Sequence, residues 1–174
     1  MCGAELTALP ETVQRVARLL QSAGHPHTPQ MLDDAARTAQ QAADLLGIEV
    51  GQVAKSIIFK RKSDNVAVLV VASGDRRVDE KKVDAIVGKT GRADADFVKA
   101  ATGFSIGGVS PFAHATEPVT LIDRVLFRFQ EIWAAAACCK TASARRASSA
   151  SVVVGVTTTK TKRAAAPRRP PAHR

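Results

Sequence analysis

Two features of the sequence could do chemistry together: a glycine-rich run and a lysine inside an apolar segment. The run GFSIGGVSPF occupies residues 103–112, and Lys55 lies in the segment AKSIIF at residues 54–59. Glycine lets another molecule approach the backbone closely, so this run is typical of a loop that exposes N–H groups. A charge inside an apolar strand is costly unless it has a partner or a function. Together, the loop and one ammonium group could hold a phosphate or an ester carbonyl.

Purely structural explanations compete with this interpretation. Glycine-rich turns commonly solve only a backbone problem, and a lysine near a strand start often keeps its ammonium in water while its stem packs. The glycine spacing does not fit the dinucleotide-binding fingerprint. Residues 88–90 (GKT) look like the end of a phosphate-binding loop, but Val83 stands where that loop needs its first glycine. We interpret residues 88–90 as a helix cap and turn.

The sequence contains no familiar pattern of nucleophile and general base. It has no Gly-x-Ser-x-Gly elbow, and its three cysteines form neither a disulfide framework nor a Cys/His dyad. His25 and His27 flank a proline without a third ligand nearby, so we expect no metal and no cofactor. His114 follows the glycine run and could line the same cleft. These absences favour a binding module, or an enzyme whose substrate supplies its own reactive group.

Charge is distributed unevenly along the 174 residues. The formal net charge is +9, yet residues 1–133 contain 16 basic and 16 acidic residues, and residues 134–174 contain 9 basic and no acidic ones. The excess therefore belongs to a tail and not to a domain surface for nucleic acid. The N-terminal segment shows no signal-peptide pattern, and no apolar run reaches the length of a membrane span. We expect a cytoplasmic protein without a membrane partner.

Helical and strand patterns alternate over the first three quarters of the chain. We predict helices at 11–23, 38–46, 79–88, 94–103 and 129–136, a hairpin of strands at 53–60 and 66–71, and a strand at 119–122. This order predicts the α/β (α+β) class with a mixed sheet. Residues 134–174 lack Leu, Ile, Phe, Asp and Glu, so most of them cannot bury enough apolar surface to fold, and only 151–156 could form a strand.

Three segments together resemble the YbaK/EbsC family, which is related to the editing domain of prolyl-tRNA synthetase. They are AADLLG at 42–47, QVAKSIIF at 52–59 and TGFSIGGVSPF at 102–112, within a likeness that covers residues from about 12 to 133. The resemblance implies a mixed, barrel-like β-sheet with flanking helices. It also implies a deacylase that hydrolyses mischarged prolyl-tRNA, with Cys-tRNA(Pro) as the first expectation and Ala-tRNA(Pro) as the second. The implied partners are mischarged tRNA(Pro) and prolyl-tRNA synthetase.

The resemblance also implies the residues of the site. It places the family's invariant lysine at Lys55 and its Gly-x-x-x-Pro loop at residues 107–111. We therefore expect Lys55, Gly107 and Gly108 to be catalytic. The residues expected to bind substrate are Ser56, Val109, Ser110, Pro111, Phe112 and His114. Loop N–H groups could polarise the ester carbonyl, while the attacking group comes from the substrate: a ribose hydroxyl, a water it orients, or a cysteine thiol. The alternative is a non-catalytic module that binds aminoacyl-tRNA or a nucleotide.

We expect residues 1–136 to form the editing domain and residues 137–174 to form a basic low-complexity tail. Relatives continue beyond the equivalent of Trp133 with a further strand and a helix, and here the tail stands in their place. The tail is interpreted as an RNA-binding arm, as an extension, or as disordered sequence from a shifted reading frame. The abrupt loss of acidic and large apolar residues favours the shifted frame.

Overall fold

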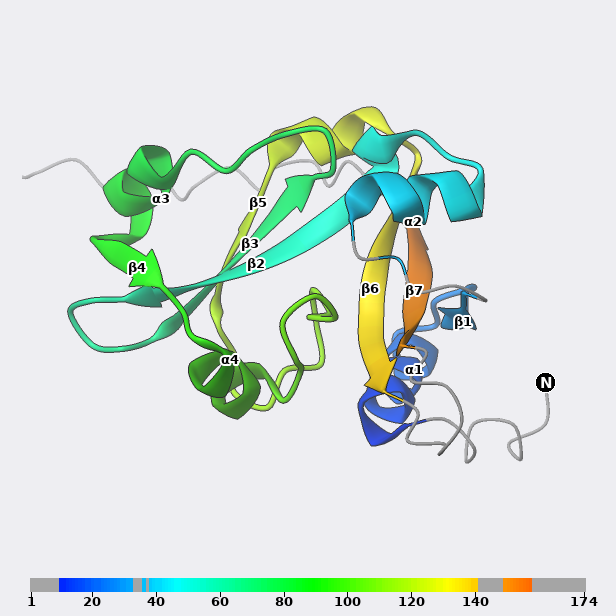
Figure 1. Ribbon diagram of the computed structural model, residues 1–174, viewed down its shortest axis with the longest axis horizontal. Helices are drawn as coiled ribbons and strands as arrows, with labels where there is room; N and C mark the ends of the chain where they lie inside the picture. The colour runs from blue at the N-terminus through cyan, green and yellow to red at the C-terminus, as the bar shows by residue number, and fades with distance from the viewer. Residues whose placement is uncertain (1–9, 33–35, 37, 141–148, 158–174) are drawn as a thin grey trace, which may run out of the picture.

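The computed structural model describes residues 10–32, 36, 38–140 and 149–157. Its helices are α1 (Glu11–Ser22), α2 (Ala39–Leu46), α3 (Glu80–Val87) and α4 (Ala95–Thr102), with the short 3₁₀ turns η2 (Val50–Gln52) and η3 (Arg124–Arg128). Its strands are β1 (Gln30–Met31), β2 (Val53–Arg61), β3 (Ala67–Ser73), β4 (Thr90–Arg92), β5 (Val119–Ile122), β6 (Glu131–Lys140) and β7 (Ser149–Thr157). Figure 1 shows the helices flanking the sheet.

The strands form one mixed sheet, so the predicted α+β class is confirmed. In the part of the chain that is described, the strand order is β1-β7-β6-β2-β3-β5, and β4 pairs with β2 beside this path. β2 and β3 form the predicted antiparallel hairpin, with Lys55 opposite Ala72. β6 lies parallel to β2, and β5 lies parallel to β3. This order runs as an open path from β1 to β5, so the sheet is open where we expected a barrel-like one.

The central hairpin is buried on both faces. On one face, Leu69 packs with Val16 of α1, Val98 of α4 and Phe104 of the glycine-rich loop. On the other face, β2 and β3 pack against Val83 of α3. All seven residues of β3 are buried, which explains the unbroken apolar sequence of its first six residues. Both cores therefore fix the position of β2, the strand that contains Lys55.

Polar side chains cap three of the helices where the predicted helical ranges begin. The side chains of Thr38, Asp79 and Asp94 each accept a hydrogen bond from the backbone N–H three residues later. This is the usual geometry of an N-cap, because it satisfies one of the free N–H groups at the helix start. Gly47 ends α2 in the left-handed conformation, at φ 65°.

The predicted helix from Phe129 to Ala136 is wrong, because this segment leads into β6. A run of alanines favours a helix locally. In the structure Ala134 and Ala136 are buried and Ala135 between them is less so, which is the alternation of a strand. Pairing with β2 and β7 outweighs the local preference.

Residues 90–92 form the short strand β4, which pairs with the far end of β2. Of these residues, residue 90 lies in the turn that we predict from the sequence.

β7 lies beyond residue 136, in the segment that we assigned to a tail. It includes residues 151–156, the one part of that segment whose sequence could form a strand. β7 pairs antiparallel with β6 on one side and with β1 on the other, where Gln30 lies opposite Val153. β6 crosses the expected division between residues 136 and 137. That division and the origin of the later residues stay predictions.

The turn after β3 crosses closely over the start of β2. Ser73 is fully buried, and its Oγ forms hydrogen bonds with the Gly51 carbonyl at 2.6 Å and with an Asp75 carboxylate oxygen at 2.7 Å. A Cβ on Gly74 would collide with the carbonyl oxygen of Val50. Glycine is therefore required for this close approach, which sets the path of the chain toward Arg76.

We predict that Gly74→Ala lowers the free energy of unfolding by about 1–3 kcal/mol, because the added methyl group has no space. Gly91→Ala is the matched control, since its Cβ would approach the flexible end of Lys62 at 3.2 Å and would lie at an ordinary contact distance of 4.0 Å from the Lys60 carbonyl oxygen. Denaturant titration of both variants measures the difference. Equal stability of the two variants would contradict this account of the turn.

Candidate active site

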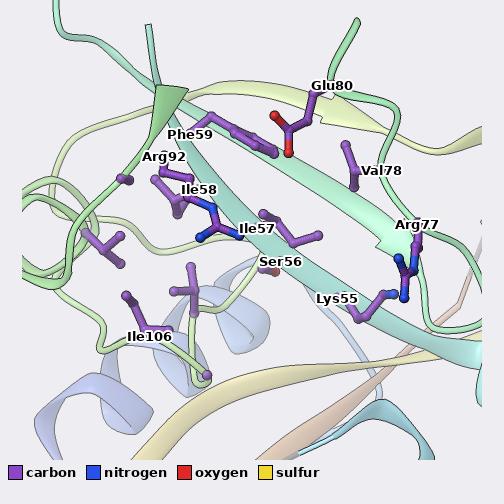
Figure 2. Close-up of a pocket in the computed structure, with 14 residues that line it drawn as sticks. Lys55, Ser56, Ile57, Ile58, Phe59, Arg77, Val78, Glu80, Arg92 and Ile106 are labelled. Carbon is purple, nitrogen blue, oxygen red and sulfur yellow. The ribbon is translucent and has the colours of Figure 1, made fainter. Parts of the chain in front are cut away.

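A cavity of about 640 Å³ lies along β2. Its walls are β2 from Lys55 to Phe59, residues 77 and 78 before α3 with Glu80 at its start, residues 92 and 93 at the end of β4, Val98 of α4, and residues 106, 107 and 109 of the glycine-rich loop. Figure 2 shows these side chains gathered along the strand. The volume is in the range of small-molecule sites, and it could receive the aminoacylated end of a nucleotide.

The cavity brings together four of the nine predicted site residues. Lys55, Ser56, Gly107 and Val109 line it, although about fifty residues separate the two pairs in the sequence. The remaining five belong to the loop behind the lining: Gly108, Ser110, Pro111, Phe112 and His114. Their roles in substrate binding or catalysis stay predictions. The contacts described below give several of them a part in shaping the loop.

Lys55 lies at one end of the cavity, and its ammonium has spare hydrogen-bonding capacity. Nζ donates a hydrogen bond to the carbonyl of Arg76 at 2.6 Å. Within the described ranges, no salt bridge involves Lys55. An ammonium has three donors, so two remain for a ligand or water. The carbonyl of Arg76 thus orients the lysine without neutralising it.

The cavity is positively charged. Figure 2 shows the side chains of Lys55 and Arg77 approaching each other at one end, with Arg92 further along β2. Glu80 is the only carboxylate among the lining residues. A concave surface with three cations and one anion concentrates positive potential, which attracts an anionic ligand such as a phosphate.

The glycine-rich loop presents one free backbone donor among its two central glycines. Gly107 has φ 91°, a conformation that favours glycine, and an added Cβ would meet no atom within 4 Å. The N–H of Gly108 donates to the carbonyl of Ser105 at 3.0 Å and closes a turn. Among the described residues, the Gly107 N–H has no such acceptor. Gly107 is therefore the better placed of the two to donate to a ligand.

His114 supports the loop from the protein interior. Its Nε2 lies 2.7 Å from the carbonyl of the buried Ser110, so this ring nitrogen carries the proton that is donated. The ring also meets Phe104 edge-on, at 5.9 Å between centroids. The Arg15 guanidinium lies over the same Phe104 ring, 4.9 Å from its centroid. Burial is the main cause that lowers the pKa of His114, and Arg15 adds to it, while the bond to Ser110 opposes it.

Arg77 and Arg92 are not among the site residues that we predicted from the sequence. A signal existed for Arg77, because the predicted hairpin places the end of its second strand beside Lys55, and Arg77 follows that end closely. Arg92 had no local signal, since its place in the site depends on β4 pairing with β2. Ile106 lies in the glycine-rich run and could have been included on that basis.

Comparison with known proteins identifies the family of this chain. Residues 33–143 match the family model described as aminoacyl-tRNA editing domain. The chain therefore belongs to the aminoacyl-tRNA editing domain family. Among the described residues, no helix combines the length and apolar content needed to cross a membrane.

Individual relatives show the same likeness. The chain is 38% identical over 99 residues to the uncharacterized protein YwhH of Bacillus subtilis (strain 168), a match that covers 56% of this chain and 62% of YwhH. It is 33% identical over 91 residues to proline–tRNA ligase of Thermoanaerobacter sp. (strain X514), covering 50% of this chain but only 16% of the ligase. A crystal structure of a candidate trans-editing enzyme for prolyl tRNA synthetase superimposes with TM-score 0.72 and 31% identity, covering 86% of this chain and 88% of that one.

We predict that His114 makes stability depend on pH. Its lowered pKa means that the folded state favours the neutral ring, so the stabilisation is present above the unfolded value of about 6.5 and is lost as pH falls below it. Melting temperature should therefore decline on acidification from neutral pH. His114→Gln keeps a donor for Ser110 but does not titrate, and should show a shallower decline. Identical pH profiles for both proteins would contradict this role.

Proposed function

We propose that this protein is a trans-editing deacylase that removes a wrong amino acid from prolyl-tRNA, with Cys-tRNA(Pro) as the first substrate and Ala-tRNA(Pro) as the second. Membership of the editing-domain family supports a mischarged tRNA as substrate. The likeness to a proline–tRNA ligase and to a candidate trans-editing enzyme supports tRNA(Pro). The proposal rests on one observation above the others: Lys55 and Gly107 line the same positively charged cavity.

The reaction adds water across the ester that joins the amino acid to the terminal ribose. It releases the free amino acid and restores the ribose hydroxyl. In our proposal, Gly107 donates its N–H to the ester carbonyl, where negative charge develops as water attacks. One such donor typically lowers the barrier by about 3–4 kcal/mol. Lys55 holds the acylated end in place by binding a phosphate or a polar group of the substrate.

The attacking group is proposed to come from the substrate. The cavity lining contains neither histidine nor cysteine. A free ribose hydroxyl next to the ester can orient a water, and a cysteine substrate can use its own thiol. Correct positioning of such groups can by itself contribute about 7 kcal/mol or more. In this proposal the protein supplies orientation and electrostatics, and it works in the cytoplasm, where charged tRNA is found.

The charge of the cavity reconciles a neutral domain with a polyanionic substrate. Residues 1–133 carry equal numbers of basic and acidic residues, so they offer no general attraction for tRNA. The cations Lys55, Arg77 and Arg92 are instead concentrated at the cavity. We propose that the protein binds the acceptor end locally and that prolyl-tRNA synthetase contributes the remaining affinity.

We predict that Lys55→Ala abolishes deacylation of Cys-tRNA(Pro) and Ala-tRNA(Pro) while the fold is retained, because Lys55 is partly exposed and none of the salt bridges among the described residues involves it. Lys82→Ala is the matched control, since the Lys82 side chain is 83% exposed on α3. Single-turnover hydrolysis measures activity, and circular dichroism checks the fold. Full activity in Lys55→Ala would refute the assignment. Tight binding without turnover by the wild-type protein would favour the non-catalytic module.

We predict that Arg92→Gln weakens binding of the acceptor end and reduces its dependence on salt. Removal of one phosphate-neutralising cation should lower the slope of log affinity against log salt concentration by about 1. Fluorescence anisotropy with a prolyl-tRNA acceptor-stem microhelix measures this slope. An unchanged slope would show that Arg92 does not contact phosphate.

A further inference from the structure

Among the described residues, nothing pairs with one edge of β2 where this strand passes the cavity. β6 pairs with β2 only at Val53 and Ala54, and β4 pairs with it only from Phe59 to Arg61. β3 occupies the opposite edge along the whole of this stretch. Residues 55–58 therefore have an open edge between β6 and β4.

The direction of each backbone group follows from two hydrogen bonds beyond this stretch. The Arg61 N–H donates to the Val66 carbonyl on the β3 side at 2.9 Å, and the Lys62 N–H donates to the Lys89 carbonyl on the β4 side at 2.8 Å. Backbone groups alternate sides along a strand, so the even-numbered residues of β2 point away from β3. Ser56 and Ile58 thus direct their N–H and C=O groups toward the open edge.

Three of these four groups have no partner in the described sheet. The last residue pair between β2 and β4 is Phe59 opposite Arg92, and the hydrogen bonds that flank this pair include one to the Ile58 carbonyl. The pairs between β2 and β6 end at Ala54. The Ser56 N–H, the Ser56 carbonyl and the Ile58 N–H remain. The Ser56 hydroxyl is also buried without a hydrogen-bond partner within the described ranges. Unpaired polar groups in a concave site are costly unless a ligand or water satisfies them.

The surroundings of this edge suit a flat ring. Ser56 and Ile58 line the cavity, together with Ile106 and Val109 of the glycine-rich loop and Val78 before α3. Ile106 is 60% exposed, an unusual position for a large apolar side chain unless a ligand covers it. A ring that extends the plane of the sheet would meet apolar side chains beside the polar edge.

We propose that this edge reads the adenine of the terminal adenosine of tRNA. The exocyclic N6 amino group donates to the Ser56 carbonyl, and N1 accepts from the Ile58 N–H. On one side of a strand, the carbonyl of a residue lies next to the N–H of the residue two positions later. The strand therefore offers an acceptor followed by a donor, which complements the N6 donor and the N1 acceptor of adenine. Guanine presents the opposite order. The cations of the cavity match the phosphates of the same nucleotide end, and the proposal rests on the proposed function.

Exchange of the terminal base tests this proposal. Alanyl-tRNA(Pro) is prepared with adenosine, inosine or 7-deazaadenosine at its 3′ end, and kcat/KM is measured for each. Inosine has an acceptor at position 6 and a donor at N1, so we expect about a tenfold loss or more. 7-Deazaadenosine keeps both groups and should remain within about twofold. Equal rates for adenosine and inosine, or a loss confined to 7-deazaadenosine, would overturn the proposal. No hydrolysis of either alanyl-tRNA(Pro) or cysteinyl-tRNA(Pro) ending in the natural adenosine would instead refute the proposed function.

A backbone substitution provides the matching test on the protein. Replacement of Ile58 by its α-hydroxy acid converts the amide N–H to an ester oxygen without changing the side chain. This N–H lies outside the ladders, so the melting temperature should change less than for the same replacement at Ile57, which pairs with Val70. We expect the variant to lose most of its preference for adenosine over inosine. An unchanged preference would overturn the proposal, and if the variant does not fold, the exchange of the terminal base decides alone.

Discussion

The architecture of this protein depends on the hydrogen bonding of β2. This strand pairs with β3 along one edge and with β6 and β4 at the two ends of the other. Apolar cores cover both faces of the hairpin, so β2 has little freedom to move. The gap between β6 and β4 is consequently a fixed opening in the sheet. Figure 1 shows the long β2 strand running from β6 to β4.

The second wall of the cavity is held just as firmly. Phe104 is buried in the core shared with α1 and α4, and Ser110 is fully buried with its carbonyl bonded by His114. The exposed Ile106 and the cavity-lining Gly107 lie between these two anchors. A loop held in this way can present its backbone donors without reorganisation when charge develops on a substrate. This explains how a site whose lining contains neither histidine nor cysteine could still accelerate ester hydrolysis.

Much of this arrangement could be predicted from sequence because it depends on local patterns. The caps at Thr38, Asp79 and Asp94, the hairpin and the strand at 119–122 follow from short signals of polarity, glycine and β-branched residues. The residue types suggested that Lys55 and the glycine-rich loop act together, and the resemblance to a family assigned their roles. β6 could not be found in this way, because its alanine run favours a helix until β2 and β7 pair with it. Arg92 was missed for the same reason, since β4 gains its role only through pairing.

The most direct test of the account is a crystal structure with adenosine that carries alanine through an amide at its 3′ position, because the amide resembles the ester but resists hydrolysis. We predict that this analogue lies in the cavity along β2, with its acyl carbonyl within hydrogen-bond distance of the Gly107 N–H and its adenine at Ser56 and Ile58. Binding at any other surface, with the β2 cavity left empty, would contradict the central claim that this cavity is the editing site.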